Sequence, residues 1–138
     1  MIRAVIDTNV FISGLFWSGK PKEVLKLAFA KKIQGVTSSA ILSELEGKLT
    51  KKFKYPQEET DNFIRLILSH FQMVEPKISF VVEADKSDNK IVEAAIEAHA
   101  EFIITGDKHL LKLQNTHGIK IVTPKEFLEY YAKAATSQ

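Results

Sequence analysis

The chain has 138 residues, of which 45% are hydrophobic and 26% are charged, and its formal net charge is +2. These values are typical of one folded domain and exclude a disordered chain, while no apolar run approaches the roughly 18 residues of a membrane-spanning helix. The sequence has no cysteine, which excludes disulfides and thiolate zinc sites, and its start does not resemble a signal peptide. We therefore expect a cytoplasmic protein without membrane contact, in which any nucleic-acid binding depends on a local basic patch.

Short apolar runs alternate with helical patterns along the chain. Strands are predicted at residues 2–6, 35–37, 74, 102–105 and 119–122. Helices are predicted at residues 10–17, 22–32, 40–54, 57–71, 85–99, 110–113 and from residue 124, with a frayed tail at 132–138. This alternation predicts a single α/β domain over residues 1–138. We expect a three-layer α/β/α sandwich with a parallel sheet of about five strands, in which residues 2–6 form the central strand.

Four acidic residues fall at one edge of this predicted sheet. Asp7 follows the first strand, and Asp107 follows the strand at 102–105. Glu44 and Asp88 each lie near the start of a helix, and helix starts share an edge with strand carboxyl ends. Clustered carboxylates repel one another unless a cation neutralises them, and oxygen ligands without His or Cys suit Mg²⁺ or Mn²⁺. The four acids therefore predict a metal site that could support displacement at phosphorus.

Each acid also has a purely structural interpretation. Asp7 and Asp88 suit the N-cap of a helix, and Asp107 belongs to a Thr-Gly-Asp sequence that is common in turns. On a helical wheel Glu44 and Glu46 lie equally close to the apolar face, so periodicity does not choose between them. The metal hypothesis depends on the set, because all four positions fall at one edge.

Four segments, taken in order, resemble a PIN domain, the fold of Mg²⁺-dependent ribonucleases. They are VIDTNVFIS at residues 5–13, SSAILSELEGKL at 38–49, DKSDNKIVEAAIEAHAEFIITGDKHLL at 85–111 and IKIVTPKEFL at 119–128. The resemblance covers nearly the whole chain and is closest to the VapC-like toxins of toxin–antitoxin pairs. It implies an Mg²⁺- or Mn²⁺-dependent endoribonuclease that leaves a 5′-phosphate and a 3′-hydroxyl, with an antitoxin protein as partner.

The resemblance also implies roles for individual residues. The family's acidic positions map onto Asp7, Glu44, Asp88 and Asp107. This mapping selects Glu44 over Glu46 and makes the four acids metal ligands, with Glu44 binding the ion or orienting the attacking water. Asn9 would hold Asp7 and a metal-bound water, and Thr105 would hydrogen-bond at the metal edge. Many members have a second Asp directly after the third acid, where this chain has Asn89, which leaves the number of metal ions open.

A basic run ends the helix predicted at 40–54. It consists of Lys48, Lys51, Lys52 and Lys54, with Phe53 and Tyr55 interleaved. Lysines at a helix carboxyl end are favoured by the helix dipole, so a solvated face is one interpretation. RNA contact beside the acidic edge is the other.

Residues 14–20 read GxxxxGK but are followed by Pro21, where a phosphate-binding loop needs Ser or Thr. We interpret this stretch as a loop between helices. Trp17 lies there either at the edge of the core or as a partner contact. Together with Leu15 and Phe16 it suits a homodimer or an antitoxin groove equally well.

Two other functions compete with the nuclease. One is a PIN domain that binds RNA or protein without cutting, although degenerate members lose acids that this chain retains. The other is a phosphotransferase that uses Asp7 as a covalent nucleophile. Such enzymes need a further acid beside the nucleophile, and here the neighbours of Asp7 are Ile6 and Thr8.

Overall fold

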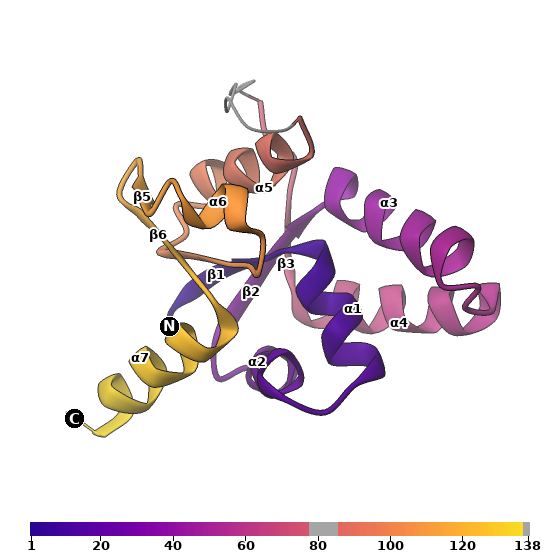
Figure 1. The fold of residues 1–138 in the computed structure, drawn as a ribbon, viewed down its shortest axis with the longest axis horizontal. Helices are drawn as coiled ribbons and strands as arrows, with labels where there is room; N and C mark the ends of the chain where they lie inside the picture. The colour runs from indigo at the N-terminus through magenta and orange to yellow at the C-terminus, as the bar shows by residue number, and fades with distance from the viewer. Residues whose placement is uncertain (78–85, 137–138) are drawn as a thin grey trace.

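A computed structural model of the protein describes residues 1–77 and 86–136, without the side chains of residues 86–88 (Figure 1). The extended segment predicted at 78–82 lies outside the described residues. The sheet contains six strands: β1 (Arg3–Ile6), β2 (Gln34–Ser38), β3 (Gln72–Val74), β4 (Phe102–Ile104), β5 (Asn115–Thr116) and β6 (Ile119–Val122). Their order is β3-β2-β1-β4-β6-β5, and β1 pairs in parallel with both β2 and β4. The α/β class and the central place of the first strand are confirmed.

The sheet has six strands rather than the expected five, because β5 pairs antiparallel with β6. The two residues of β5 are polar and carry no apolar alternation, so the sequence pattern does not reveal the strand. A two-residue loop joins β5 to β6, and both of its residues, His117 at φ 53° and Gly118 at φ 76°, have positive φ. Positive φ at both positions is the requirement of a tight type I′ hairpin turn.

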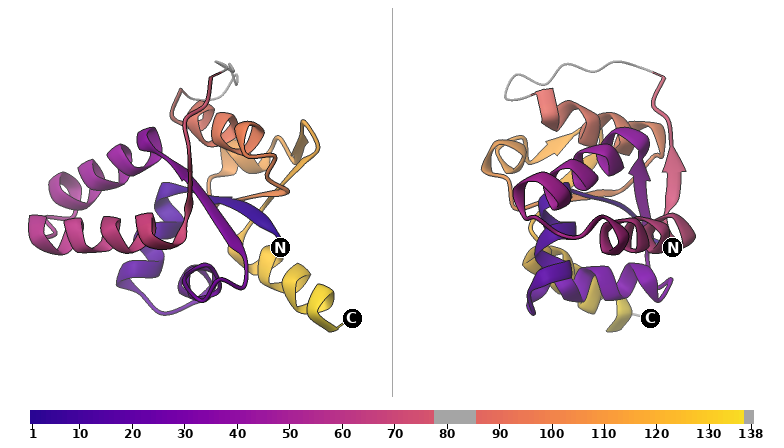
Figure 2. Two further views of the ribbon diagram at one scale, coloured as in Figure 1. Left: turned by 180° about the vertical axis from the view of Figure 1, so that it is seen from behind. Right: turned by 90° about the vertical axis from the view of Figure 1, so that its right-hand side faces the viewer.

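Seven α-helices and one π-helical segment are assigned in the described ranges. They are α1 (Thr8–Phe16), α2 (Lys20–Phe29), α3 (Ser39–Gly47), η1 (Lys48–Lys52), α4 (Gln57–His70), α5 (Lys86–Glu97), α6 (Lys108–Leu111) and α7 (Pro124–Thr136). Helix α5 packs on β1, β2 and β4 from one side, and α2 and α7 pack together on the other side of the sheet (Figure 2). In the part of the chain that is described, no helix is long and apolar enough to cross a membrane.

Two helix ends differ from the predicted bounds. The last helix is assigned as far as Thr136, and it packs against α2. The helix predicted at 40–54 leaves α-helical geometry at Lys48 and continues as η1. Residues 14–20 span the end of α1, a short loop and the start of α2, as the two-helix interpretation requires.

The topology brings the ends of β1 and β4 and the start of α3 to one edge of the sheet. In the centre of that sheet Ala4, Val5 and Ile6 are fully buried, as are Ile103 and Ile104 of the neighbouring strand. A strand that is buried on both faces has a continuous apolar sequence, as in β1. Polar side chains that follow these strands directly are therefore held on a rigid base.

Candidate metal and active site

Asp7 is the best-buried acid at this edge, with 7% of its surface exposed. Its backbone N–H donates to the Ile104 carbonyl at 3.0 Å, which continues the pairing of β1 with β4. It occupies the N-cap position of α1, yet its side chain makes no capping hydrogen bond. Instead Oδ2 accepts a hydrogen bond from the Thr105 hydroxyl at 2.7 Å. The side chain is therefore turned toward β4, and a capping role does not explain it.

Thr105 connects the acids that follow β1 and β4. It is fully buried, and its backbone N–H donates to the Val122 carbonyl at 2.9 Å. Its Oγ1 donates to Asp7 and accepts from the backbone N–H of Asp107 at 2.9 Å. One hydroxyl thus sets the position of Asp7 relative to the loop that carries Asp107.

Asp107 stabilises the turn that follows β4 and also acts on Asp7 at the acidic edge. Its Oδ1 accepts from the backbone N–H of His109 at 2.8 Å, which caps the short helix α6. Its charge also acts on Asp7, because repulsion from Glu44 and Asp107 contributes to raising the pKa of Asp7. The turn interpretation of Asp107 is therefore correct and compatible with a place in the acidic cluster.

The pKa of Asp7 is raised above its ordinary value, chiefly because burial removes water from the carboxylate. Hydrogen bonds from Thr105 and from the backbone of Thr8 oppose this effect only in part. Among the described residues Asp7 has no basic partner within 4 Å. A buried carboxylate that lacks a counter-charge is costly, and a bound cation would remove that cost.

Glu44 lies in a different electrostatic environment. Its Oε1 is 2.5 Å from Lys90 Nζ, and its Oε2 is 3.5 Å from Lys48 Nζ. Burial raises its pKa, but the contact with Lys90 and the charges of Lys90 and Lys48 outweigh burial, so that its pKa is lowered. Glu46 instead accepts a hydrogen bond from Gln57 at 3.1 Å. The structure thus places Glu44, not Glu46, at the acidic edge, a choice that the helical wheel leaves open.

Two residues at the edge were not predicted from sequence. Lys90 lies 46 residues from Glu44 in the chain, so no local pattern could reveal the pair. The Thr8 hydroxyl is buried, and its interaction with Glu44 helps to lower the pKa of that carboxyl group.

Asn9 and Lys48, two residues with predicted roles, contact each other. Asn9 Oδ1 accepts from Lys48 Nζ at 3.3 Å. Lys48 is thereby joined to the acidic edge, whereas Lys51, Lys52 and Lys54 are exposed. Glu44 and Lys48 are four residues apart in the sequence, a spacing at which side chains on a helix meet. The contact between Glu44 and Lys48 could therefore have been predicted from the sequence.

The donors suit a hard divalent cation, because they are carboxylate and hydroxyl oxygens. Within residues 1–77 and 86–136, excluding undescribed side chains, no three His, Asp or Glu residues form a ready-made metal site. Asp88 lies in the first turn of α5, where it is predicted, but its side chain is outside the described part. Lys90, two residues further along α5, holds Glu44. The described acids at this edge are therefore Asp7, Glu44 and Asp107.

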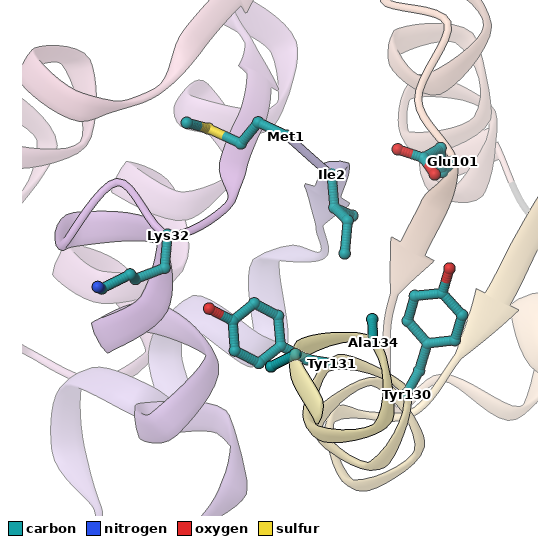
Figure 3. Close-up of a pocket in the computed structure, with 8 residues that line it drawn as sticks. Met1, Ile2, Lys32, Glu101, Tyr130, Tyr131 and Ala134 are labelled. Atoms are coloured by element: carbon teal, nitrogen blue, oxygen red, sulfur yellow. The ribbon is translucent and has the colours of Figure 1, made fainter. Parts of the chain in front are cut away.

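A pocket of about 420 Å³ lies at the opposite edge of the sheet (Figure 3). Its lining includes Ile2 and Glu101, which precede β1 and β4, and Tyr130 and Tyr131 of α7. It is therefore separated from the acids by the length of the strands.

Replacing Lys90 with Met should strengthen metal binding. The change removes the positive charge nearest to Glu44, so the site becomes more negative. The Mn²⁺ concentration that gives half the maximal thermal shift should fall by roughly tenfold, the effect of one nearby charge at an effective dielectric constant of about 20. Lys26→Met is the matched control, because Lys26 pairs with Glu23 on an exposed helix at 3.7 Å. Equal or weaker Mn²⁺ binding by Lys90→Met would contradict a cation site at Glu44.

This fold, with acids at the carboxyl edge of a parallel sheet, is that of a PIN domain. Residues 3–109 match the PIN domain family model, and the chain belongs to that family. An uncharacterized protein of Methanocaldococcus jannaschii, MJ1680, is 40% identical, and the match covers 96% of this chain and 93% of that protein.

Two solved structures extend the comparison of the fold. The structure of VapBC2 from Rickettsia felis bound to a DNA fragment from its promoter contains a similar chain, with a TM-score of 0.64 and 16% identity. The match covers 88% of this chain and 98% of that one. The PIN domain endonuclease Utp24 has a TM-score of 0.52 and 17% identity, and the match covers 88% of this chain and 84% of that one.

Proposed function

We propose that the protein is an Mg²⁺- or Mn²⁺-dependent endoribonuclease. One observation carries the proposal: in a PIN domain, the buried Asp7 carboxylate is repelled by Glu44 and Asp107, and no basic group among the described residues lies within 4 Å of it. Such a group needs a cation, and the oxygen donors around it select a hard one. The similarity in fold to an endonuclease supports the same interpretation.

In this proposal Asp7, Asp88, Asp107 and Glu44 hold the ion. When bound, the ion would stabilise charge on the scissile phosphate and activate water. Glu44, already ionised beside Lys90, either ligates the ion or orients the attacking water. Thr105 orients Asp7 through its hydroxyl, Asn9 supports the edge through Lys48, and Lys51, Lys52 and Lys54 contact RNA phosphate.

The test compares cleavage of a labelled RNA by the wild type, Asp7→Asn and Asp88→Asn, with Mn²⁺ or with EDTA. We expect cleavage only by the wild type with Mn²⁺, and products with a 5′-phosphate and a 3′-hydroxyl. Because each exchange removes one charge and keeps the side-chain shape, loss of cleavage reports on ligation rather than on folding. Equal cleavage by the three proteins would rule out the catalytic assignment.

A catalytically silent RNA- or protein-binding module is the second candidate. It is favoured by the contact between Lys90 and Glu44 at 2.5 Å, which neutralises one acid internally. A silent module would bind RNA without cutting it under any metal condition. The same experiment, read for binding as well as cleavage, separates the two functions.

We further propose that the protein acts in the cytoplasm as the toxin of a toxin–antitoxin pair. The support is similarity in fold to a chain of a VapBC complex and the sequence resemblance to VapC-like toxins. Expression should arrest growth, and co-expression of the product of an adjacent small gene should relieve the arrest. Free expression without arrest would contradict the toxin role but would leave the nuclease proposal intact.

A further inference from the structure

Aromatic side chains gather at the outer end of α1, away from the carboxylates. The Phe16 ring lies 5.6 Å from Trp17, 5.5 Å from Phe53 and 5.1 Å from Tyr55, measured between ring centroids. We call these four residues the aromatic cluster. Phe16 packs against the core, but Trp17 is 57% exposed and Phe53 is 38% exposed. The cluster therefore presents two aromatic rings to solvent on a supported base.

Three exposed lysines lie close in sequence to these two rings. Lys20 follows Trp17 at the start of α2, and Lys51 and Lys52 belong to η1. None of the three has an acidic partner within 4 Å in the described ranges. Lys52 Nζ lies 5.7 Å from the centre of the Phe53 ring. The Tyr55 hydroxyl instead donates a hydrogen bond to a glutamate of α4.

The cluster is continuous with the acidic edge. Lys48, the first residue of η1, contacts Glu44 and Asn9, whereas Phe53 directly follows the last residue of η1. Along α1, Asn9 and Phe16 are seven residues apart, which corresponds to about 10 Å of helix. A strand of a few nucleotides can span this distance. π-Helical segments such as η1 are rare in proteins. Those that do occur are often found at functional sites.

We propose that Trp17 and Phe53 stack on bases of single-stranded RNA, while the lysines of η1 contact its phosphates. Lys48, which lies between the aromatic cluster and the acids, contacts the phosphate nearest to the acids. This inference rests on the proposed function, since it supplies the substrate path for that site. Aromatic faces combined with a cationic groove characterise binding of single strands without strong sequence preference. A protein partner is the poorer match, because lysine is depleted in protein interfaces.

Trp17 is the only tryptophan in the chain, so its fluorescence reports on the cluster directly. EDTA keeps the RNA intact during a titration. We expect saturable quenching by a single-stranded RNA oligonucleotide and none by the same sequence in a duplex, whose bases are already stacked. Labelled oligonucleotide should bind about tenfold more weakly to Trp17→Ala, while Trp17→Phe, which keeps a ring, should retain most of the affinity.

One control variant and one charge variant separate the contribution of stacking from that of the lysine charges. Leu68→Ala removes an apolar side chain of similar exposure, 45%, from α4 and should bind RNA as the wild type does. Changing both Lys51 and Lys52 to Gln should reduce the slope of log affinity against log salt by roughly 0.7 for each phosphate that the lysines no longer neutralise. An unchanged slope would remove the lysines of η1 from the proposal.

Several results would overturn the stacking site: equal binding by Trp17→Ala and wild type, equal quenching by duplex, or quenching by a protein partner but not by RNA. The nuclease proposal and the stacking site can be rejected separately. Absence of metal-dependent cleavage together with Trp17-dependent binding would leave the stacking site standing. Metal-dependent cleavage by a protein whose Trp17 is never quenched would retain the nuclease and reject the stacking site.

Discussion

Asp7→Asn should abolish RNA cleavage and, in the absence of metal, make the protein more stable. The substitution removes a buried charge that has no basic partner within 4 Å in the described part of the chain, and Asn can still accept the hydrogen bond from Thr105. We expect cleavage to fall by at least about a hundredfold, because even residues that only support a metal ligand typically contribute ten- to a hundredfold. Asp61→Asn, at a partly exposed position of α4, should change neither property, because Asn can still accept the hydrogen bond from Gln57.

The pH dependence of folding stability fixes the direction of the stability change expected for Asp7→Asn. The folded state raises the pKa of Asp7 above 3.8, so folding favours the protonated carboxyl group. As pH rises through 3.8 and then through the raised pKa, the ionised group destabilises the folded state, and this destabilisation persists at neutral pH. The gain in Tm of Asp7→Asn in EDTA should therefore be present at pH 7 and disappear below pH 3.8. Mn²⁺ should raise the Tm of the wild type but not of the variant. A variant less stable than the wild type in EDTA would contradict the account of Asp7.

Thr105→Val should weaken both stability and activity, although the two side chains have nearly the same shape. The variant loses the hydroxyl that donates to Asp7 and accepts from the Asp107 backbone, which leaves two polar groups without this partner. We expect a loss of about 1–3 kcal/mol in the free energy of unfolding and a ten- to a hundredfold loss of cleavage, roughly the effect of removing an outer-shell contact. Denaturant unfolding and cleavage assays measure the two effects.

Thr37→Val is the matched control for this variant. Thr37 is also fully buried, in β2 on the other side of β1, but its hydroxyl has no hydrogen-bond partner among the described residues. Removing an unsatisfied hydroxyl should be neutral or stabilising, and cleavage should be unchanged. If both valine variants lost the same stability, the loss would come from packing and not from the hydrogen bonds of Thr105.

The sequence predicts the part of the site that follows from the hydrophobic pattern of the strands and from their order along the chain. The apolar run of β1 ends at Asp7, the next parallel strand ends before Thr105, and a parallel sheet must bring these ends together. Wheel periodicity alone could not choose between Glu44 and Glu46, because the choice depends on Lys90 of α5. The ligand role of Asp88 stays a prediction, since only its place in α5 is described.

Features that lack a local pattern could not be predicted. The pairing of Lys90 with Glu44 depends on how α5 packs beside α3. The strand β5 exists because a tight turn returns the chain along β6, and its two polar residues give no strand signal. The contact of Asn9 with Lys48 depends on the side-by-side placement of α1 and α3, so it could not be read from the sequence, and the expected support of Asp7 by Asn9 stays a prediction.

Anomalous diffraction from crystals soaked in Mn²⁺ would test the central claim most directly. The proposal predicts a peak at the carboxyl edge of β1, with an oxygen of Asp7 about 2.0–2.2 Å away and carboxylates of Glu44, Asp88 or Asp107 completing the shell, close to the Mg²⁺ distance. In the Asp7→Asn crystal the peak should be lost or strongly weakened. A preparation that cleaves RNA with Mn²⁺ yet shows no peak at Asp7 would contradict the proposed site.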